Sequence, residues 1–378
     1  MRIAFDAKRA AQNRTGLGNY SRFVIRILQR YYPDDMQLLY VPDPRKTQCL
    51  GKNLTSPDRA SLRFPQGLWR KLRSAWRVWG VTADARRDGC DVFHGLSNEL
   101  PLNVSKAGCR KVVTIHDLIF VHCPEYYHWI DRKIYDFKFR RACRNADVVV
   151  AVSEYTKREI MRYYGTPEHK IRVVYQGCDP AFAAPVPQEK TDEVKNRYKL
   201  PSRFVLYVGS IERRKNLMIV AKAFAENREL RDSGMKVVAV GKRTAYTDEI
   251  ASYLDAEGIG DRFLFFHNVP FADLPSFYRC ATAFVYPSRI EGFGIPLLEA
   301  ISAGVPAIGC TGSCLEEAGG PDSIYVNPDD HRAMAEAIVR VADDPVLRKT
   351  MTDRGKAYAQ RFSDESLARQ LHDIYTCL

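Results

Sequence analysis

Residues 282–299 read Thr-Ala-Phe-Val-Tyr-Pro-Ser-Arg-Ile-Glu-Gly-Phe-Gly-Ile-Pro-Leu-Leu-Glu. The apolar run at 282–286 predicts a buried strand, and Pro296 suits the start of a helix because its missing amide proton costs nothing there. Gly292 and Gly294 lie between the two and let backbone amides approach a ligand at a helix terminus that carries partial positive charge. A strand, a glycine loop and a helix in this order predict an anion site in an α/β fold.

The same succession of short apolar runs and longer helical patterns continues through most of the 378 residues. We expect strands near 2–7, 37–41, 90–94, 111–115, 147–152, 171–175, 203–209, 236–241, 262–266, 282–286, 305–309 and 323–326. We expect helices near 18–31, 130–145, 154–164, 215–228, 246–257, 271–280, 296–303, 331–342 and 364–375. Strands that alternate with helices predict parallel sheets covered by helices on both faces.

A change of composition divides this pattern in two. The segment 178–202 contains four prolines and a polar stretch from 188 to 196, which is typical of a linker between domains. The sequence therefore predicts two Rossmann-like, doubly wound domains, 1–180 and 181–362, followed by a terminal helical segment, 363–378. Two such domains would face each other across a cleft, with functional residues in the loops that follow the strands.

Composition limits the class of protein. The net charge is +12 and the isoelectric point about 9.2, which favours an anionic partner such as nucleic acid, a phosphate-bearing ligand or an acidic membrane face. The sequence has no run of about 18 apolar residues and no secretory pattern at its start, so we expect a cytoplasmic protein. The ten cysteines include no C-x-x-C pair and are expected to be free thiols.

A basic turn follows the strand expected at 203–209. Arg213, Arg214 and Lys215 come directly after it, at the start of the next helix, where cations oppose the helix dipole and repel one another. A bound anion would remove both problems, and a diphosphate held by Arg214 and Lys215 is the natural candidate. The alternative is a solvated basic turn.

Carboxylates and further glycines add to the candidate site. Glu291 and Glu299 could accept hydrogen bonds from vicinal hydroxyls of a sugar or a ribose, whereas a plain turn and a helix start are the simpler interpretation. Gly16 and Gly18 lie in a loop between the first strand and a helix, where backbone amides could face phosphates. This loop resembles a dinucleotide fingerprint only in part, because Ser21 occupies the place of its third glycine.

Two polar residues follow other strands of the first domain. His116 ends the strand at 111–115, and a structural role and a catalytic role are about equally plausible there. Ser153 follows the strand at 147–152, where serine is also a good helix cap. The sequence has no histidine pairing or Asp-x-Asp placement that would predict a metal site, so none is expected.

The segment 63–80 contains five basic residues, no acidic residue and three of the four tryptophans. Trp69, Trp76 and Trp79 recur at helical spacing, while Arg73 and Arg77 fall on another face. A basic helix that carries tryptophans suits the surface of an anionic bilayer. The alternative is a helix whose aromatic face packs on the sheet. Nucleic acid fits less well, because no binding motif accompanies the charge.

Taken together, these motifs resemble those of the retaining glycosyltransferases of family 4, which have the GT-B architecture. The resemblance runs through nearly the whole chain, and its carriers occur in the family's order. They are 16–20, His116-Asp117, 152–154, 208–216, Gly241-Lys242, 274–281 and 291–299, the last with two glutamates at the family's spacing.

The resemblance implies roles for the matching residues. His116, Arg214, Lys215 and Glu291 would be catalytic: the two cations neutralise the departing diphosphate, Glu291 holds the donor sugar, and His116 lies near that sugar. The other donor-binding residues would be Gly16, Gly18, Ser153, Lys242, Phe293, Gly294, Ile295 and Glu299, with Glu299 on the ribose. The terminal helix would cross back to the first domain. One departure is Ser210, where many members have arginine, so phosphate binding would depend more on Arg214 and Lys215.

The implied reaction is a metal-independent sugar transfer that needs no cofactor and retains the anomeric configuration. The form of 211–216 is closest to mannosyltransferases of bacterial surface-polysaccharide synthesis, which suggests GDP-mannose as donor and a glycan or lipid-linked saccharide as acceptor. A lipid-linked acceptor would explain the segment 63–80 and a peripheral place on the inner face of the membrane. The alternatives are an NAD-dependent oxidoreductase, an epimerase or phosphorylase of the same fold, and a non-enzymatic basic carbohydrate- or membrane-binding protein.

Overall fold

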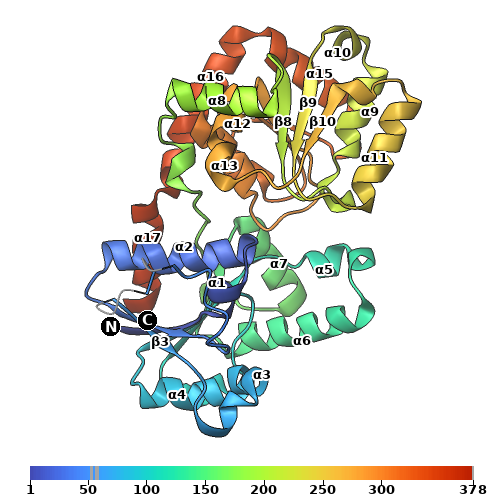
Figure 1. Ribbon diagram of the computed structural model, residues 1–378. Coiled ribbons are helices and arrows are strands. Elements are labelled where there is room, and N and C mark those ends of the chain that lie inside the picture. The colour runs from blue at the N-terminus through green and yellow to red at the C-terminus, as the bar shows by residue number, and fades with distance from the viewer. Residues whose placement is uncertain (52–53, 56–58, 377–378) are drawn as a thin grey trace. The chain divides into compact units, whose positions relative to one another are not determined.

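A computed structural model describes residues 1–51, 54–55 and 59–376 of the chain (Figure 1). The chain divides into two compact units. The first unit is Met1–Gly177 together with Phe362–Leu378, and the second is Cys178–Arg361.

The first unit is built on a seven-stranded parallel sheet. Its strands are β1 (Arg2–Asp6), β2 (Met36–Tyr40), β3 (Ala60–Arg63), β4 (Val92–Gly95), β5 (Arg110–Ile115), β6 (Val148–Ala151) and β7 (Ile171–Val173). They lie in the order β3-β2-β1-β4-β5-β6-β7. The chain thus builds the sheet outward from β1 in one direction and then, from β4, in the other.

The second unit repeats this plan with six parallel strands. They are β8 (Phe204–Val208), β9 (Lys236–Val240), β10 (Phe263–Phe266), β11 (Ala283–Tyr286), β12 (Ala307–Cys310) and β13 (Ile324–Val326), in the order β10-β9-β8-β11-β12-β13. Most side chains of the central strands β8 and β11 are buried, as expected of a parallel sheet covered on both faces.

Helices cover both faces of each sheet. In the first unit they are α1 (Lys8–Gln12), α2 (Gly16–Tyr31), α3 (Arg73–Ala75), α4 (Val81–Arg87), α5 (Ile119–His122), α6 (Trp129–Asn145), α7 (Glu154–Tyr164) and α17 (Asp364–Thr376). In the second unit they are α8 (Gln188–Tyr198), α9 (Met218–Glu226), α10 (Arg228–Asp232), α11 (Ala245–Ala256), α12 (Leu274–Cys280), α13 (Ile295–Ala303), α14 (Leu315–Gly319), α15 (His331–Asp343) and α16 (Pro345–Ala359). Within the second unit, α9 and α11 lie on one side of the sheet and α12 and α13 on the other (Figure 1). The predicted α/β fold of two doubly wound domains is confirmed.

Two predictions about local structure are wrong. The stretch 188–196, interpreted as part of a linker, forms most of helix α8. The helix buries Val194 and packs on α12, so its few apolar residues suffice to hold it in place. Strand β3 was missed because Ala60–Arg63 has no β-branched residue; it pairs only with β2, at the edge of the sheet.

The basic tryptophan segment is not one amphipathic helix. It contains a 3₁₀ turn at Gly67–Arg70, the short α3 and a π-helical turn at Trp76–Gly80. Trp76 is buried in the core, where its indole N–H donates to Asp84 at 2.7 Å, so for this residue the alternative of packing on the sheet is correct. Trp79, by contrast, is about half exposed.

Two further findings concern the described residues as a whole. None of the helices described is long and apolar enough to cross a bilayer. The nine cysteines that the structure describes are all free thiols, as the sequence predicts, and Cys377 lies outside the described residues.

Candidate functional site

The strand order of each sheet reverses at one place. This switch point lies between β1 and β4 in the first unit and between β8 and β11 in the second. Loops that leave neighbouring strands at such a point run to opposite faces of the sheet and leave a crevice at the carboxyl ends of the strands, where ligands bind in doubly wound folds. The predicted residues Arg214, Lys215 and Glu291 lie in the two loops that follow β8 and β11.

In the second unit, these loops bring the two cations onto one carboxylate oxygen. Arg214 donates from Nη1 to Oε1 of Glu291 at 2.9 Å, and the ammonium of Lys215 donates to the same oxygen. The hydroxyl of Ser288 also donates to it, at 2.6 Å. Lys215 further donates to the hydroxyl of Tyr286 at 2.5 Å. The cluster thus combines two cations with one buried carboxylate, and the exposed Glu212 lies 3.9 Å from Nη2 of Arg214 as an outer partner.

The electrostatics of this cluster keep Glu291 ionised. Burial opposes ionisation of the carboxyl, but the charges of Lys215 and Arg214 hold its pKa at about 2. Burial also lowers the pKa of the Lys215 ammonium, and the negative charge of Glu291 opposes that shift. The largely buried cations outnumber the buried carboxylate, which favours the binding of a further anion at this site.

The three basic residues of the turn do not share one direction. Arg213 donates to Glu249 at 2.5 Å and lies over the ring of Tyr246, so it belongs to the surface of the second unit. Arg214 and Lys215 point to Glu291, and both are largely buried. The solvated-turn alternative therefore describes Arg213 alone.

The glycine loop that follows Glu291 leads into α13. Gly294 has a φ of +107°, and a Cβ there would lie 2.7 Å from a side-chain carbon of Leu315, so the position requires glycine. Phe293 is buried and Ile295 is the first residue of α13. The loop therefore positions backbone amides at the start of a helix beside the cationic cluster, as an anion site needs.

Glu299 lies one turn into α13 and has a different environment from Glu291. It accepts a hydrogen bond from the hydroxyl of Tyr278 at 2.8 Å. Burial raises the pKa of its carboxyl to about 7, and the nearby charge of Asp179 acts in the same direction. Lys242, which follows β9 as the sequence predicts, is exposed and makes no ion pair with any described residue.

In the first unit, helix α1 follows β1, and the short turn after α1 leads into α2, which begins at Gly16. The two glycines predicted to lie in a loop are therefore in the first turn of α2. A Cβ on Gly18 would lie 1.9 Å from the backbone oxygen of Asn13, so only glycine fits this close approach of two backbone segments. Nothing lies within 4 Å of the place where a Cβ on Gly16 would be, and Gly16 is exposed. Gly18 is thus explained by packing, whereas Gly16 leaves the tip of α2 open.

His116 follows β5, and both of its ring nitrogens are engaged. Nε2 lies 2.9 Å from the backbone oxygen of Leu96, and Nδ1 lies 3.3 Å from the side-chain nitrogen of Gln176. Since a carbonyl only accepts, we assign the ring proton to Nε2. Burial lowers the pKa of His116 to about 4, so the ring is neutral at pH 7. The ring of Tyr20 packs edge-on against the His116 ring, with 4.6 Å between the two ring centroids.

Ser153 caps α7. Its hydroxyl oxygen accepts a hydrogen bond from the amide of Thr156 at 3.0 Å, and the side chain is fully buried. This is the helix-cap role that the sequence left open as the alternative to donor binding.

Several residues around these sites were not predicted. Tyr286 and Ser288, which contact Glu291, lie at the end of β11 or just after it, so the same position rule could have found them. Cys314 donates from Sγ to the backbone oxygen of Glu291 at 3.1 Å, and nothing in its local sequence indicates this. Tyr278 was passed over because it lies within a helix.

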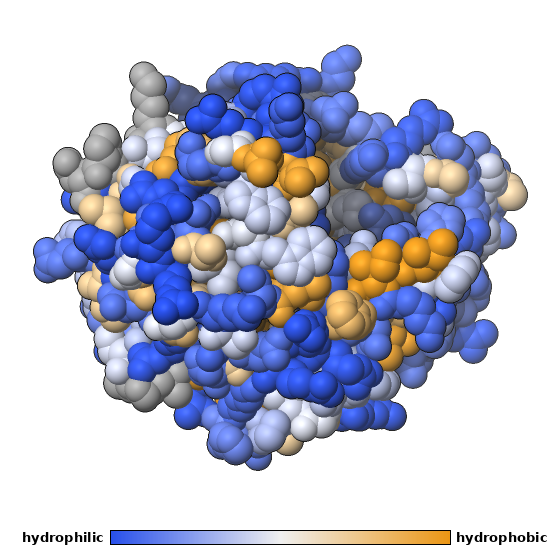
Figure 2. Space-filling view, turned by 90° about the horizontal axis from the view of Figure 1, so that it is seen from below, coloured by the Kyte–Doolittle hydropathy of each residue, from blue (hydrophilic) through white to orange (hydrophobic). Residues whose placement is uncertain are grey.

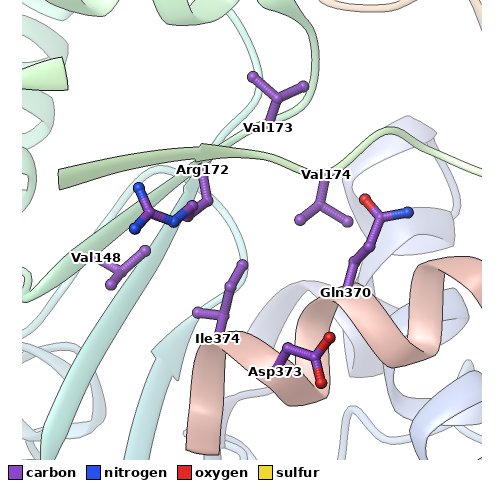
Figure 3. A pocket seen from close by; sticks show the side chains of 7 residues that line it. All are labelled: Val148, Arg172, Val173, Val174, Gln370, Asp373 and Ile374. Carbon is purple, nitrogen blue, oxygen red and sulfur yellow. The ribbon is translucent and has the colours of Figure 1, made fainter. Parts of the chain in front are cut away.

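A pocket of about 270 Å³ lies elsewhere in the first unit, beside the edge strand β7. Figure 3 shows Gln370, Asp373 and Ile374 projecting into it from α17, near Arg172 and Val174. None of the predicted site residues lines this pocket. Among the described residues, no group of three or more potential metal ligands occurs.

Comparisons with known proteins agree with the motifs and the fold. A family model described as "Glycosyl transferases group 1" matches residues 188–358, and one described as "Glycosyltransferase Family 4" matches residues 38–182. The chain is 31% identical to O-antigen chain mannosyltransferase B of Escherichia coli over 82% of its own length and 79% of that protein. It is 27% identical to O-antigen chain mannosyltransferase RfbU of Salmonella typhimurium over 62% of each.

Among solved structures, the Anabaena protein HepE, crystallised with UDP and glucose, matches with a TM-score of 0.76. The match covers 100% of both chains at 18% identity, which shows that the fold is shared. The two family models and the 31% identical relative agree with the family that the order of motifs indicates. The chain belongs to the family 4 glycosyltransferases, with the GT-B fold, and is an enzyme that transfers a sugar.

Proposed function

We propose that this enzyme transfers mannose from GDP-mannose to a glycan or lipid-linked saccharide, retains the anomeric configuration, and needs neither a metal ion nor a cofactor. The observation that carries the proposal is the cluster of Arg214, Lys215 and Glu291 at the switch point of the second sheet. The two mannosyltransferases of O-antigen synthesis among its relatives support mannose as the sugar and a surface polysaccharide as the product.

The chemistry of this cluster suits the departure of a nucleoside diphosphate. When the bond between the sugar and the diphosphate breaks, negative charge develops on the diphosphate oxygen. The guanidinium of Arg214, the ammonium of Lys215 and the amides at the start of α13 would stabilise that charge without a metal ion. Because these groups are already fixed by Glu291 and by the fold, little reorganisation would accompany the step.

The two glutamates would hold the rings on either side of the diphosphate. The described hydrogen bonds of the Glu291 carboxylate all go to Oε1, so Oε2 would accept from hydroxyls of the sugar. Glu299 would accept from the ribose hydroxyls. Neutral His116 would add a positioning contact near the sugar, after one of its present hydrogen bonds gives way.

A donor panel tests the proposal. Binding to the folded state raises its melting temperature by mass action, so GDP-mannose should raise Tm more than UDP-glucose, UDP-galactose or ADP-glucose at equal concentration. The product formed from GDP-mannose and a mannose-containing acceptor should have the α-configuration by NMR, and EDTA should leave the rate unchanged. A larger Tm shift with a UDP-sugar would overturn GDP-mannose as the donor. A product of inverted configuration would overturn retention, and loss of activity in EDTA would overturn metal independence.

The pKa of Glu299 predicts a pH dependence of donor binding. When the pH falls below the pKa of Glu299, which is about 7, the carboxyl gains a proton and accepts hydrogen bonds from hydroxyls less well. The KM for the donor should therefore rise about tenfold as the pH falls from 8 to 6, since the ionised fraction falls by about that factor. Initial rates of Glu299→Gln, which cannot ionise, should show a high KM and no such rise. The same pH profile in both proteins would contradict the ribose role.

A further inference from the structure

One face of the first unit carries an unusual density of apolar side chains. All but two of the exposed large apolar side chains that the structure describes lie between residues 68 and 137; the exceptions are Phe271 and Val346. Helix α6 contributes Trp129, which is 70% exposed, and Phe137, which is 56% exposed; Leu68 in the tryptophan segment is 84% exposed. Figure 2 shows apolar side chains gathered among charged ones on the face seen from below.

The outward side of α6 is more apolar than expected for a helix face that contacts only water. Ile130, Ile134 and Phe137 follow one another at the spacing of three and four residues that aligns side chains on one face. All three are exposed, while Phe139 and Cys143 on the opposite side pack in the core against the sheet. The helix thus has an apolar stripe on both sides, and the described residues bury only one of them.

The exposed part of the tryptophan segment adjoins α6. Arg141 of α6 donates to the backbone oxygen of Leu102 at 2.8 Å, and the amide of Leu102 donates to Val78 at 2.9 Å. The side chain of Asn103 donates to the backbone oxygen of Trp79 at 3.0 Å. Residues 102 and 103 therefore join α6 to the tryptophan segment. These two segments pack on the same face of the sheet.

Cations accompany these apolar side chains. Lys133 in α6, and Arg70 and Lys71 in the tryptophan segment, are exposed and form no ion pair with any described residue. By contrast, Arg77 is largely buried between Asp6 and Glu99 and takes no part in the surface. Asp131 of α6 is exposed as well, so the surface combines tryptophan, phenylalanine and isoleucine with an excess of exposed cations over carboxylates.

We propose that this docking face, formed by Leu72, Trp79 and the outward side of α6, binds the surface of an anionic bilayer. Aromatic and aliphatic side chains enter the interface of the bilayer, while lysine and arginine contact acidic headgroups. A second copy of the chain is a poorer occupant, because a two-fold symmetric contact would bring together two copies of the same positively charged surface. Docking itself does not depend on the proposed function; only its purpose, access to a lipid-linked acceptor, rests on it.

Vesicle sedimentation of the full chain tests the proposal. The wild-type protein should bind vesicles that contain 30% phosphatidylglycerol and should bind phosphatidylcholine vesicles weakly. Trp129→Gln with Phe137→Gln should lower the partition coefficient at least tenfold, and so should the triple change Arg70→Gln, Lys71→Gln and Lys133→Gln. Circular dichroism and Tm establish that the variants remain folded.

Matched controls remove the same chemistry from the second unit. Phe271→Gln with Val346→Gln removes two exposed apolar side chains, and the changes of Lys222, Arg332 and Lys356 to glutamine remove three exposed cations. Both controls should bind like wild type. Absence of wild-type binding, equal loss in the controls, equal binding to neutral vesicles, or a dimer in light scattering that only the docking-face variants dissociate would overturn the proposal. The donor-induced Tm shift should be unchanged in every variant, so a failure here is separable from a failure of the proposed function.

Discussion

Lys215→Ala is expected to lower kcat for sugar transfer at least tenfold, about 1.4 kcal/mol of activation free energy. In the proposed reaction the ammonium would be one of two cations that face the developing charge of the leaving diphosphate, and Glu291 and Tyr286 hold it in place. Because that charge is larger in the transition state than in the bound donor, kcat should fall more than the KM for the donor rises. Initial rates over a range of donor concentrations separate the two parameters.

Arg213→Ala is the matched control for this change. It removes a cation from the same turn, but one that is exposed and paired with Glu249. We expect kcat and KM within about twofold of wild type, since an exposed ion pair contributes little. If Arg213→Ala and Lys215→Ala lose activity equally, the turn acts through its overall charge or its fold, and the assignment of Lys215 is wrong.

Glu291→Ala is expected to lower both activity, at least tenfold, and stability. The change leaves the buried Lys215 without a carboxylate and leaves Arg214 with only the exposed Glu212, 3.9 Å away, which costs roughly 3 kcal/mol of the free energy of unfolding. An added anion should restore part of that loss. Urea unfolding should therefore show that GDP stabilises Glu291→Ala more than it stabilises the wild-type enzyme.

Glu291→Gln separates charge from packing in the same experiment. Glutamine keeps the shape of the side chain and can still accept from Ser288, but it cannot compensate the two cations. Its stability should fall with that of the alanine variant. A glutamine variant as stable as wild type would mean that packing, not charge, holds the loop, and the electrostatic argument for the cluster would fail.

The sequence was most informative where a strand end fixes the place of a side chain. Arg214, Lys215 and Glu291 follow central strands at the switch point, and their position alone predicts that they approach one another. It also named Arg214 and Lys215 rather than Arg213, but it could not show the 3₁₀ turn that directs Arg213 away from Glu291. It also could not predict Cys314, whose contact with the loop depends on packing between segments distant in sequence.

The errors in the fold have a common cause. Strands with many apolar and β-branched residues were all found, whereas β3 is an edge strand of four residues, half-buried along most of its length. Helix α8 has only one fully buried side chain, Val194, so its sequence has almost no amphipathic signal. In the segment 63–80, spacing predicted one continuous helix, but Trp76 is fixed by its hydrogen bond to Asp84 and the helix type changes there.

The place of α17 in the first unit has a consequence for biosynthesis. Its Tyr375 hydroxyl lies 2.6 Å from Nδ1 of the buried His94, and Asp364 pairs with Arg26 of α2 at 2.8 Å. Both contacts join residues separated by more than 270 positions, so a ribosome makes all of 178–361 before it makes the segment that completes the first unit. During translation the contiguous second unit can therefore fold first. Until α17 is made, one side of α2 stays uncovered, and chaperones can bind the incomplete first unit.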